Sequence, residues 1–111
     1  MKIFKGTKKI GEGTLYATLL QQTIGLMFSL NKKIVIFQFN QERKVSIHTW
    51  FMFFYLDLIY LNKKKKIVEI KRNLHPFSLF KPQKKASYII EAPSGFVRKY
   101  KLKEHLTLQL R

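Results

Sequence analysis

The sequence has no cysteine, only six acidic residues and only three prolines in 111 residues. The lack of cysteine excludes disulfides and thiolate metal sites, and a reducing compartment is the natural setting. The few acids leave little material for a pair of catalytic carboxylates. No apolar run reaches the roughly 18 residues that a membrane-spanning helix needs. The first residues, MKIFKGTKKIGEGT, are basic but contain no apolar core of signal-peptide length, so we expect a cytoplasmic protein.

Basic residues, in contrast, are abundant. There are 22 of them, which gives a net charge of +16. A protein this basic attracts polyanions, above all nucleic acid. Only four are arginines, however, and bidentate contacts to phosphate or guanine favour arginine, whereas lysine also serves as a solubilising surface. The charge therefore has two explanations: nucleic-acid binding, or a general compositional bias toward lysine.

The apolar content suits one domain, residues 1–111, with one packed core, since 46% of residues are hydrophobic and 14% aromatic. The longest apolar stretch, residues 50–61, is too short to span a membrane and contains Asp57. Its aromatic and branched residues indicate strands buried on both faces, with a bend near 54–56. Four lysines follow, so we predict a hairpin with strands 57–62 and 66–72 and a turn at 63–65.

The same patterns predict the remaining elements. Strands are expected at 34–39 and 44–50, paired as a hairpin around the polar residues 40–43, and at 86–92. Two segments near the N-terminus should pair around Lys8-Lys9, and the tail alternates with Leu106, Leu108 and Leu110 on one face. Short helices are predicted after Thr18, ending near Gly25, and after Ser94 as the capping residue, with Phe96, Val97 and Tyr100 at helical spacing. The predicted fold is mainly β (α+β), a compact antiparallel β-sandwich or barrel of about seven short strands with two short helices.

Several short motifs occur in a characteristic order: Gly25-Leu26-Met27, Trp50-Phe51-Met52, Asp57, Pro76 and Glu91-Ala92-Pro93-Ser94-Gly95. This series resembles the prokaryotic domain of unknown function 192 family over residues 14–110. The chain departs from the family pattern at Tyr55, where the family usually has proline, and at Glu104-His105, where it usually has a Gly-Asp turn. The resemblance implies a compact β-rich domain and no established activity.

Asp57 is the most informative single residue. Both faces of its strand are apolar, so the carboxylate should be at least half buried and must be paired or hydrogen-bonded. It either ties down neighbouring backbone N–H groups or serves as a perturbed carboxylate in a pocket. The three histidines share no metal-binding spacing, and a His48–Asp57–His75 metal site would require the fold to gather them. We therefore predict no metal and no cofactor.

The aromatic residues of 50–54 suggest a cleft. Some of them should lie under the proline-containing loop 73–86, together with Phe77 and Phe80, with a rim of Lys81, Lys84 and Lys85. Such a cleft suits a small ligand or an unstacked base. The alternative is a hydrophobic cluster that only holds the loop down.

Three functional hypotheses remain. The sequence favours a binding protein over an enzyme, because it has no Gly-x-Ser-x-Gly motif and no glycine-rich phosphate loop. The first hypothesis is a non-catalytic binding or accessory domain, monomeric or weakly dimeric and without membrane contact, whose candidate ligand-binding residues are His48, Trp50, Met52, Asp57, His75, Phe77 and Phe80. The second is a nucleic-acid (RNA or DNA) associated protein using Lys63, Lys64, Lys65, Lys66, Lys81, Lys84, Lys85, Arg98, Lys99 and Lys101. The third is a small enzyme or a carbohydrate or small-molecule binder with a pocket near His48 and Asp57.

Overall fold

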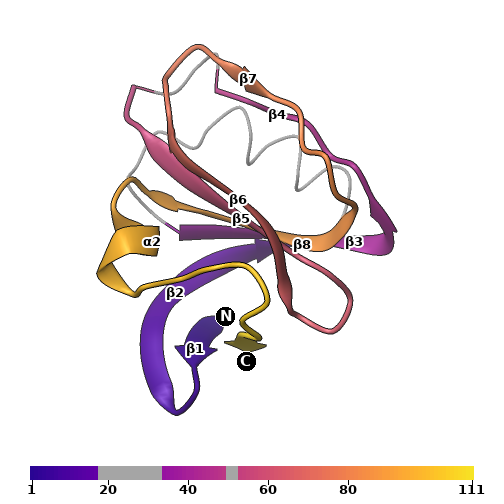
Figure 1. Ribbon diagram of the computed structural model, residues 1–111, viewed down its shortest axis with the longest axis vertical. Coiled ribbons are helices and arrows are strands. Elements are labelled where there is room, and N and C mark those ends of the chain that lie inside the picture. The colour runs from indigo at the N-terminus through magenta and orange to yellow at the C-terminus, as the bar shows by residue number, and fades with distance from the viewer. Residues whose placement is uncertain (18–33, 50–52) are drawn as a thin grey trace.

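The computed structural model describes residues 1–17, 34–49 and 53–111. Their elements are β1 (Lys2–Lys5), β2 (Lys8–Tyr16), β3 (Ile34–Arg43), β4 (Ile47–His48), β5 (Leu56–Leu61), β6 (Ile67–Leu74), β7 (Leu79–Phe80), β8 (Ala86–Pro93), α2 (Phe96–Lys99) and β9 (Gln109–Leu110). Seven strands form one sheet in the order β6-β5-β8-β3-β2-β1-β9, and β4 pairs with β7. The sheet curls, and the two chain ends lie side by side (Figure 1). The prediction of a mainly β fold is confirmed.

The central strands are buried on both faces, as the sequence of β5, apolar except for Asp57, predicted. One face carries Ile36, Ile59 and Ile90 and is covered by α2 and the C-terminal tail. The opposite face carries Phe37, Leu58, Tyr60 and Ile89 and packs against Ile47 of β4 and Phe80 of β7. Because residues alternate between faces along each strand, each central strand contributes to both hydrophobic clusters.

The β5–β6 hairpin is confirmed. The two strands are antiparallel, and the Asn62 side-chain oxygen accepts hydrogen bonds from the N–H groups of Lys64 and Lys66, both at 3.0 Å. Lys65 has φ 63°, a conformation that a turn residue can tolerate. Within the part of the chain that the structure describes, no helix has the length and apolar content that crossing a membrane would demand.

The predicted hairpin between 34–39 and 44–50 is wrong. β3 continues through residues 40–43 to Arg43, and β4 pairs with β7 instead. Along residues 35–37 both hydrogen-bonding edges of β3 are already occupied, by β2 in parallel and by β8 in antiparallel orientation. This part of β3 has no edge left for the segment that follows the strand, and that segment forms its ladder with β7 in the loop before β8.

The predictions made for each end of the chain are confirmed, with one correction. β1 and β2 are antiparallel, but the turn lies at residues 6–7, where Gly6 has φ 62°, and not at Lys8-Lys9. In the tail, Leu108 and Leu110 are buried and Leu106 is half-buried, which confirms the predicted alternation. The helix predicted after Thr18 lies outside the described residues.

Gly13 allows the parallel strands β2 and β3 to approach closely. A Cβ atom at Gly13 would lie 2.8 Å from the Ile34 carbonyl oxygen, whereas a Cβ atom at Gly11 would meet the flexible end of the Ile34 side chain at 2.6 Å. We expect Gly13→Ala to lower the free energy of unfolding by about 1–3 kcal/mol, because backbone must move. Gly11→Ala is the matched control and should cost less in the same chemical denaturation experiment. Equal costs would contradict this account.

Candidate anion-binding site

Asp57 lies on β5 and is only 1% exposed. Its carboxylate accepts three backbone hydrogen bonds, from the N–H groups of Asn73 at 3.0 Å, Gly95 at 3.2 Å and Val97 at 2.9 Å. These bonds join β5 to β6 and to the start of α2. The contacts match the structural role that the sequence suggested for a buried aspartate.

The helix after Pro93 begins differently from the prediction. Gly95, with φ 99°, occupies the capping position, and glycine has no side chain that could cap the helix. The Ser94 hydroxyl instead hydrogen-bonds the Asn73 side chain. The prediction that Ser94 caps the helix is therefore wrong, because Asp57 on a neighbouring strand already accepts the free N–H groups at this end.

The two phenylalanines of the 73–86 loop have different environments. Phe80 is half-buried and packs against Tyr60, with ring centroids 5.9 Å apart. Phe77 is 62% exposed and contacts Phe53, which is 73% exposed, in an edge-on arrangement at 5.8 Å. Phe80 therefore holds the loop on the sheet, whereas Phe77 and Phe53 present their rings to solvent. Trp50 and Met52, the other aromatic and thioether candidates, lie outside the described residues.

The histidines do not converge on Asp57. β4, which carries the half-buried His48, packs on the sheet face opposite to α2 and Asp57. His75 is exposed, with its ring 4.9 Å from that of Tyr55. Among the residues that the structure describes, no three His, Asp or Glu side chains are grouped so that they could hold a metal ion. The structure thus does not bring His48, Asp57 and His75 into one site.

Carboxylates in this chain hold backbone N–H groups more often than they hold lysines. The Glu69 carboxylate accepts from the N–H groups of Gln83 and Lys84, at 2.9 and 2.8 Å, and so fixes the loop before β8. The Glu42 carboxylate accepts from the N–H of Lys63 at 2.8 Å. These carboxylates therefore stabilise loops and turns.

Only one ion pair occurs within residues 1–17, 34–49 and 53–111, between Lys9 and Glu12 at 2.8 Å. The hydrogen bond to Lys9, followed by its charge, lowers the pKa of the Glu12 carboxyl. Since the remaining lysines in these segments form no ion pair with a carboxylate, their positive charge is left largely uncompensated. This surface is suited to an anionic partner.

The C-terminal tail contacts one of the lysine clusters expected from the sequence. Residues 63–66 form the β5–β6 turn, and the tail pairs with this turn through Leu108 N–H to Lys65 O at 2.9 Å and an antiparallel bridge between Lys66 and Thr107. The tail leads back to Lys101 and Lys99 at the end of α2. The loop that carries Lys84 is attached to β6 by Glu69. The lysines at 63–66 thus precede β6, Lys84 is held against β6, and Lys99 and Lys101 lie at the end of α2.

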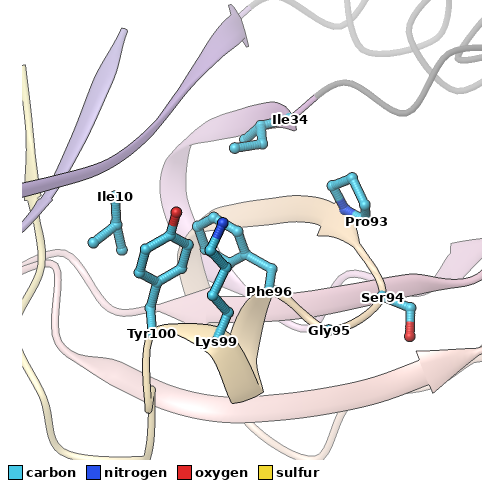
Figure 2. A pocket seen from close by; sticks show the side chains of 8 residues that line it. All are labelled: Ile10, Ile34, Pro93, Ser94, Gly95, Phe96, Lys99 and Tyr100. Carbon is cyan, nitrogen blue, oxygen red and sulfur yellow. The ribbon is translucent and has the colours of Figure 1, made fainter.

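Two adjoining cavities surround Tyr100. The larger, of about 400 Å³, is mainly apolar and includes Ile10, Ile34, Pro93 and Phe96 in its wall (Figure 2). The smaller, of about 230 Å³, is basic, and its wall includes Lys5, Lys8 and Lys101. Ile10, Lys99 and Tyr100 line both cavities. No acidic side chain is among the described residues that line either one.

The ammonium groups around Tyr100 are held by specific contacts. Lys5 Nζ donates to the Tyr100 carbonyl oxygen at 2.9 Å. The Nζ atoms of Lys8 and Lys99 lie 5.7 and 5.3 Å from the centroid of the Tyr100 ring, within cation–π range. Sequence reasoning identified Lys99 and Lys101 but missed Lys5 and Lys8. No local pattern marks them, because only tertiary folding brings β1 and β2 to residues that lie more than 90 positions away.

Glu91 is a second buried carboxylate, 2% exposed, on β8. Its register partners Val35 and Leu58 belong to the hydrophobic cluster on the face opposite to α2. Both carboxylate oxygens are buried and have no hydrogen-bond partner among the described residues. Burial raises the pKa of the Glu91 carboxyl to about 7.

Comparison with known proteins identifies the family. The profile of DUF192, described as uncharacterized ACR, matches residues 4–110. The chain belongs to the DUF192 family. A UPF0127 protein of Thermococcus kodakarensis is 33% identical over 103 residues, which cover 90% of this chain and 65% of that protein. A UPF0127 protein of Pyrococcus furiosus is 32% identical over 80 residues, 70% of this chain and 68% of that protein.

Two solved structures share this DUF192 fold. A protein of unknown function from Novosphingobium aromaticivorans has a TM-score of 0.82 at 17% identity, covering 98% of this chain and 82% of that one. A protein from Sinorhizobium meliloti, described as a candidate transcription regulator, has a TM-score of 0.76 at 21% identity, covering 86% and 78%. At these identities the likeness establishes the fold alone.

Two of the motifs that suggested DUF192 are in direct contact. The Asp57 carboxylate accepts a hydrogen bond from the N–H of Gly95, the last residue of the Glu91–Gly95 motif. Asp57 therefore holds the turn that this motif forms. Pro76 lies in the loop that Thr49 binds, through its N–H to Ser78 O at 2.8 Å. The motifs at residues 25–27 and 50–52 lie outside the described residues.

Proposed function

We propose that this DUF192 protein is a non-catalytic binding domain whose partner is nucleic acid, held through contacts between lysines and phosphates. The observation that supports the proposal is the uncompensated charge. Of 22 basic and six acidic residues, the described segments contain one ion pair, and Asp57, Glu42 and Glu69 all hold backbone N–H groups. A phosphate backbone would supply the missing negative charge.

Lysine-rich contacts favour binding with little sequence preference. Lysine is a flexible point charge, whereas reading of base edges relies mainly on arginine and amide side chains presented in a groove. The helix at the basic surface, α2, has only four residues, so it offers no long basic face for the major groove. We therefore expect affinity to come mostly from counterion release.

Titration of single-stranded RNA and DNA at two salt concentrations tests the proposal. Binding is expected at low salt and should weaken steeply as the salt concentration rises. A variant with glutamate at Lys63, Lys64 and Lys66 should lose about tenfold or more in affinity at low salt. Lys9→Glu is the control at a lysine that Glu12 already neutralises, and it should weaken binding much less.

The lysine substitutions in the loop before β8, at Lys81, Lys84 and Lys85, form a second set for the same titration. Absence of binding even at low salt would refute the proposal. Binding that persists at high salt with a clear sequence preference would also contradict it, because contacts other than lysine–phosphate pairs would then dominate.

A further inference from the structure

We infer that the two cavities around Tyr100 form a subsite for one unpaired nucleotide, with the base in the apolar cavity and its phosphate in the basic cavity. This inference rests on the proposed function and makes it specific, because it selects single-stranded over duplex nucleic acid. It is carried by the adjoining geometry of the two cavities and by the charges in their walls.

The apolar cavity has the size and lining that a base requires. Its volume of about 400 Å³ falls in the range of small-ligand pockets. The rings of Phe96 and Tyr100 lie 4.9 Å apart at 59°, and Ile34 and Pro93 lie across the cavity from Tyr100 and Lys99 (Figure 2). Bases stack on aromatic side chains in this kind of site without regard to sequence.

The basic cavity has the charge that a phosphate requires. Lys5, Lys8, Lys99 and Lys101 line it, and no acidic residue does so among the described residues. Lys5 is held in place because its ammonium group donates to the carbonyl oxygens of Tyr100, at 2.9 Å, and of Lys101, at 3.5 Å. A lysine side chain that is already held in this way loses less conformational entropy when the ligand binds.

The two cavities are adjacent, as the base and the phosphate of one nucleotide are. Lys99 and Tyr100 line both, so a base and its phosphate can occupy neighbouring spaces on either side of the same two residues. A base within a duplex is paired and stacked, and it cannot enter such a cavity without being extruded at a cost of a few kcal/mol. A base in a single strand is already unpaired, so moving it into the cavity costs much less free energy. We therefore expect single strands to bind more tightly.

The experiment compares three labelled polymers of equal length at low salt by fluorescence anisotropy: single-stranded DNA, duplex DNA, and a single strand in which every base is replaced by an abasic site. Wild-type protein should bind the single strand at least about fivefold more tightly than the abasic strand, as stacking of one base predicts. Tyr100→Ala should lower affinity for the single strand by about 5- to 150-fold and lower affinity for the abasic strand much less.

Matched variants separate the ring from the fold. Tyr100→Phe keeps the ring and should bind as wild type does. Phe77→Ala removes an exposed ring that lines neither cavity and should have no effect. Lys8→Gln, at an exposed residue, should weaken binding to all three polymers, since it removes a phosphate contact, and it should do so more than Lys9→Gln.

The outcomes distinguish this inference from the proposed function. Equal affinity for the three polymers would overturn the nucleotide subsite while leaving the lysine surface intact. Equal loss of single-strand and abasic binding in Tyr100→Ala would also overturn it, because the ring would then act only through the fold. Loss in Phe77→Ala without loss in Tyr100→Ala would place the stacked base elsewhere. No binding of any polymer would refute the proposed function itself.

Discussion

Replacing Asp57 with alanine is expected to lower the free energy of unfolding by about 3 kcal/mol. The substitution leaves the N–H groups of Asn73, Gly95 and Val97 without their acceptor, and each unsatisfied donor that is buried costs about 1–3 kcal/mol. Water can reach part of this site, so the costs do not add fully. A loss of this size is a large fraction of the roughly 5–15 kcal/mol that stabilises a domain of ordinary size.

Chemical denaturation of the wild type, Asp57→Ala and Asp57→Asn measures this effect. Asparagine keeps the shape and one acceptor oxygen, so its loss should lie between the other two. Glu12→Ala removes an exposed carboxylate that forms only the Lys9 ion pair, and it should leave stability unchanged. If Asp57→Ala were as stable as the wild type, the carboxylate would instead belong to a ligand pocket, the alternative that the sequence left open.

Glu91→Gln is expected to stabilise the protein above pH 7 and to have little effect near pH 4. Burial raises the pKa of the Glu91 carboxyl from 4.5 to about 7 in the folded state. The folded protein therefore binds more protons than the unfolded chain between these two values, so its stability falls as the pH rises through this window. Below the window the carboxyl is neutral in both states. Above it, the buried charge costs about 3 kcal/mol.

Unfolding free energies at pH 4, 5.5 and 8 test this prediction through the difference between variant and wild type. The difference should grow from pH 4 to pH 8, because glutamine cannot ionise. Glu104→Gln, at an exposed position, is the control for the general effect of removing one negative charge. A difference that does not change with pH would show that ionisation of Glu91 does not cause the expected pH dependence of the unfolding free energy.

The sequence was most informative where a residue's environment depends on its near neighbours. The run at β5, apolar except for Asp57, predicted burial on both faces, and Asn62 followed by four lysines predicted the turn that joins β5 to β6. The same reasoning failed after β3, because a polar stretch at 40–43 marks a turn only if the strand before it has a free edge. β2 and β8 occupy both edges of β3 along residues 35–37, and no local pattern reports this.

The sequence by itself determined the mainly β character, the burial of Asp57 and the large positive charge, since each follows from composition or from period-two alternation. Only the tertiary structure decided what Asp57 binds and where Lys5 and Lys8 lie. Asp57 reaches the start of α2 across 40 positions, and Lys5 reaches the Tyr100 carbonyl across 95. Such contacts depend on the order and register in which strands pair. Those are set by packing of the whole sheet, which no short segment of the chain encodes.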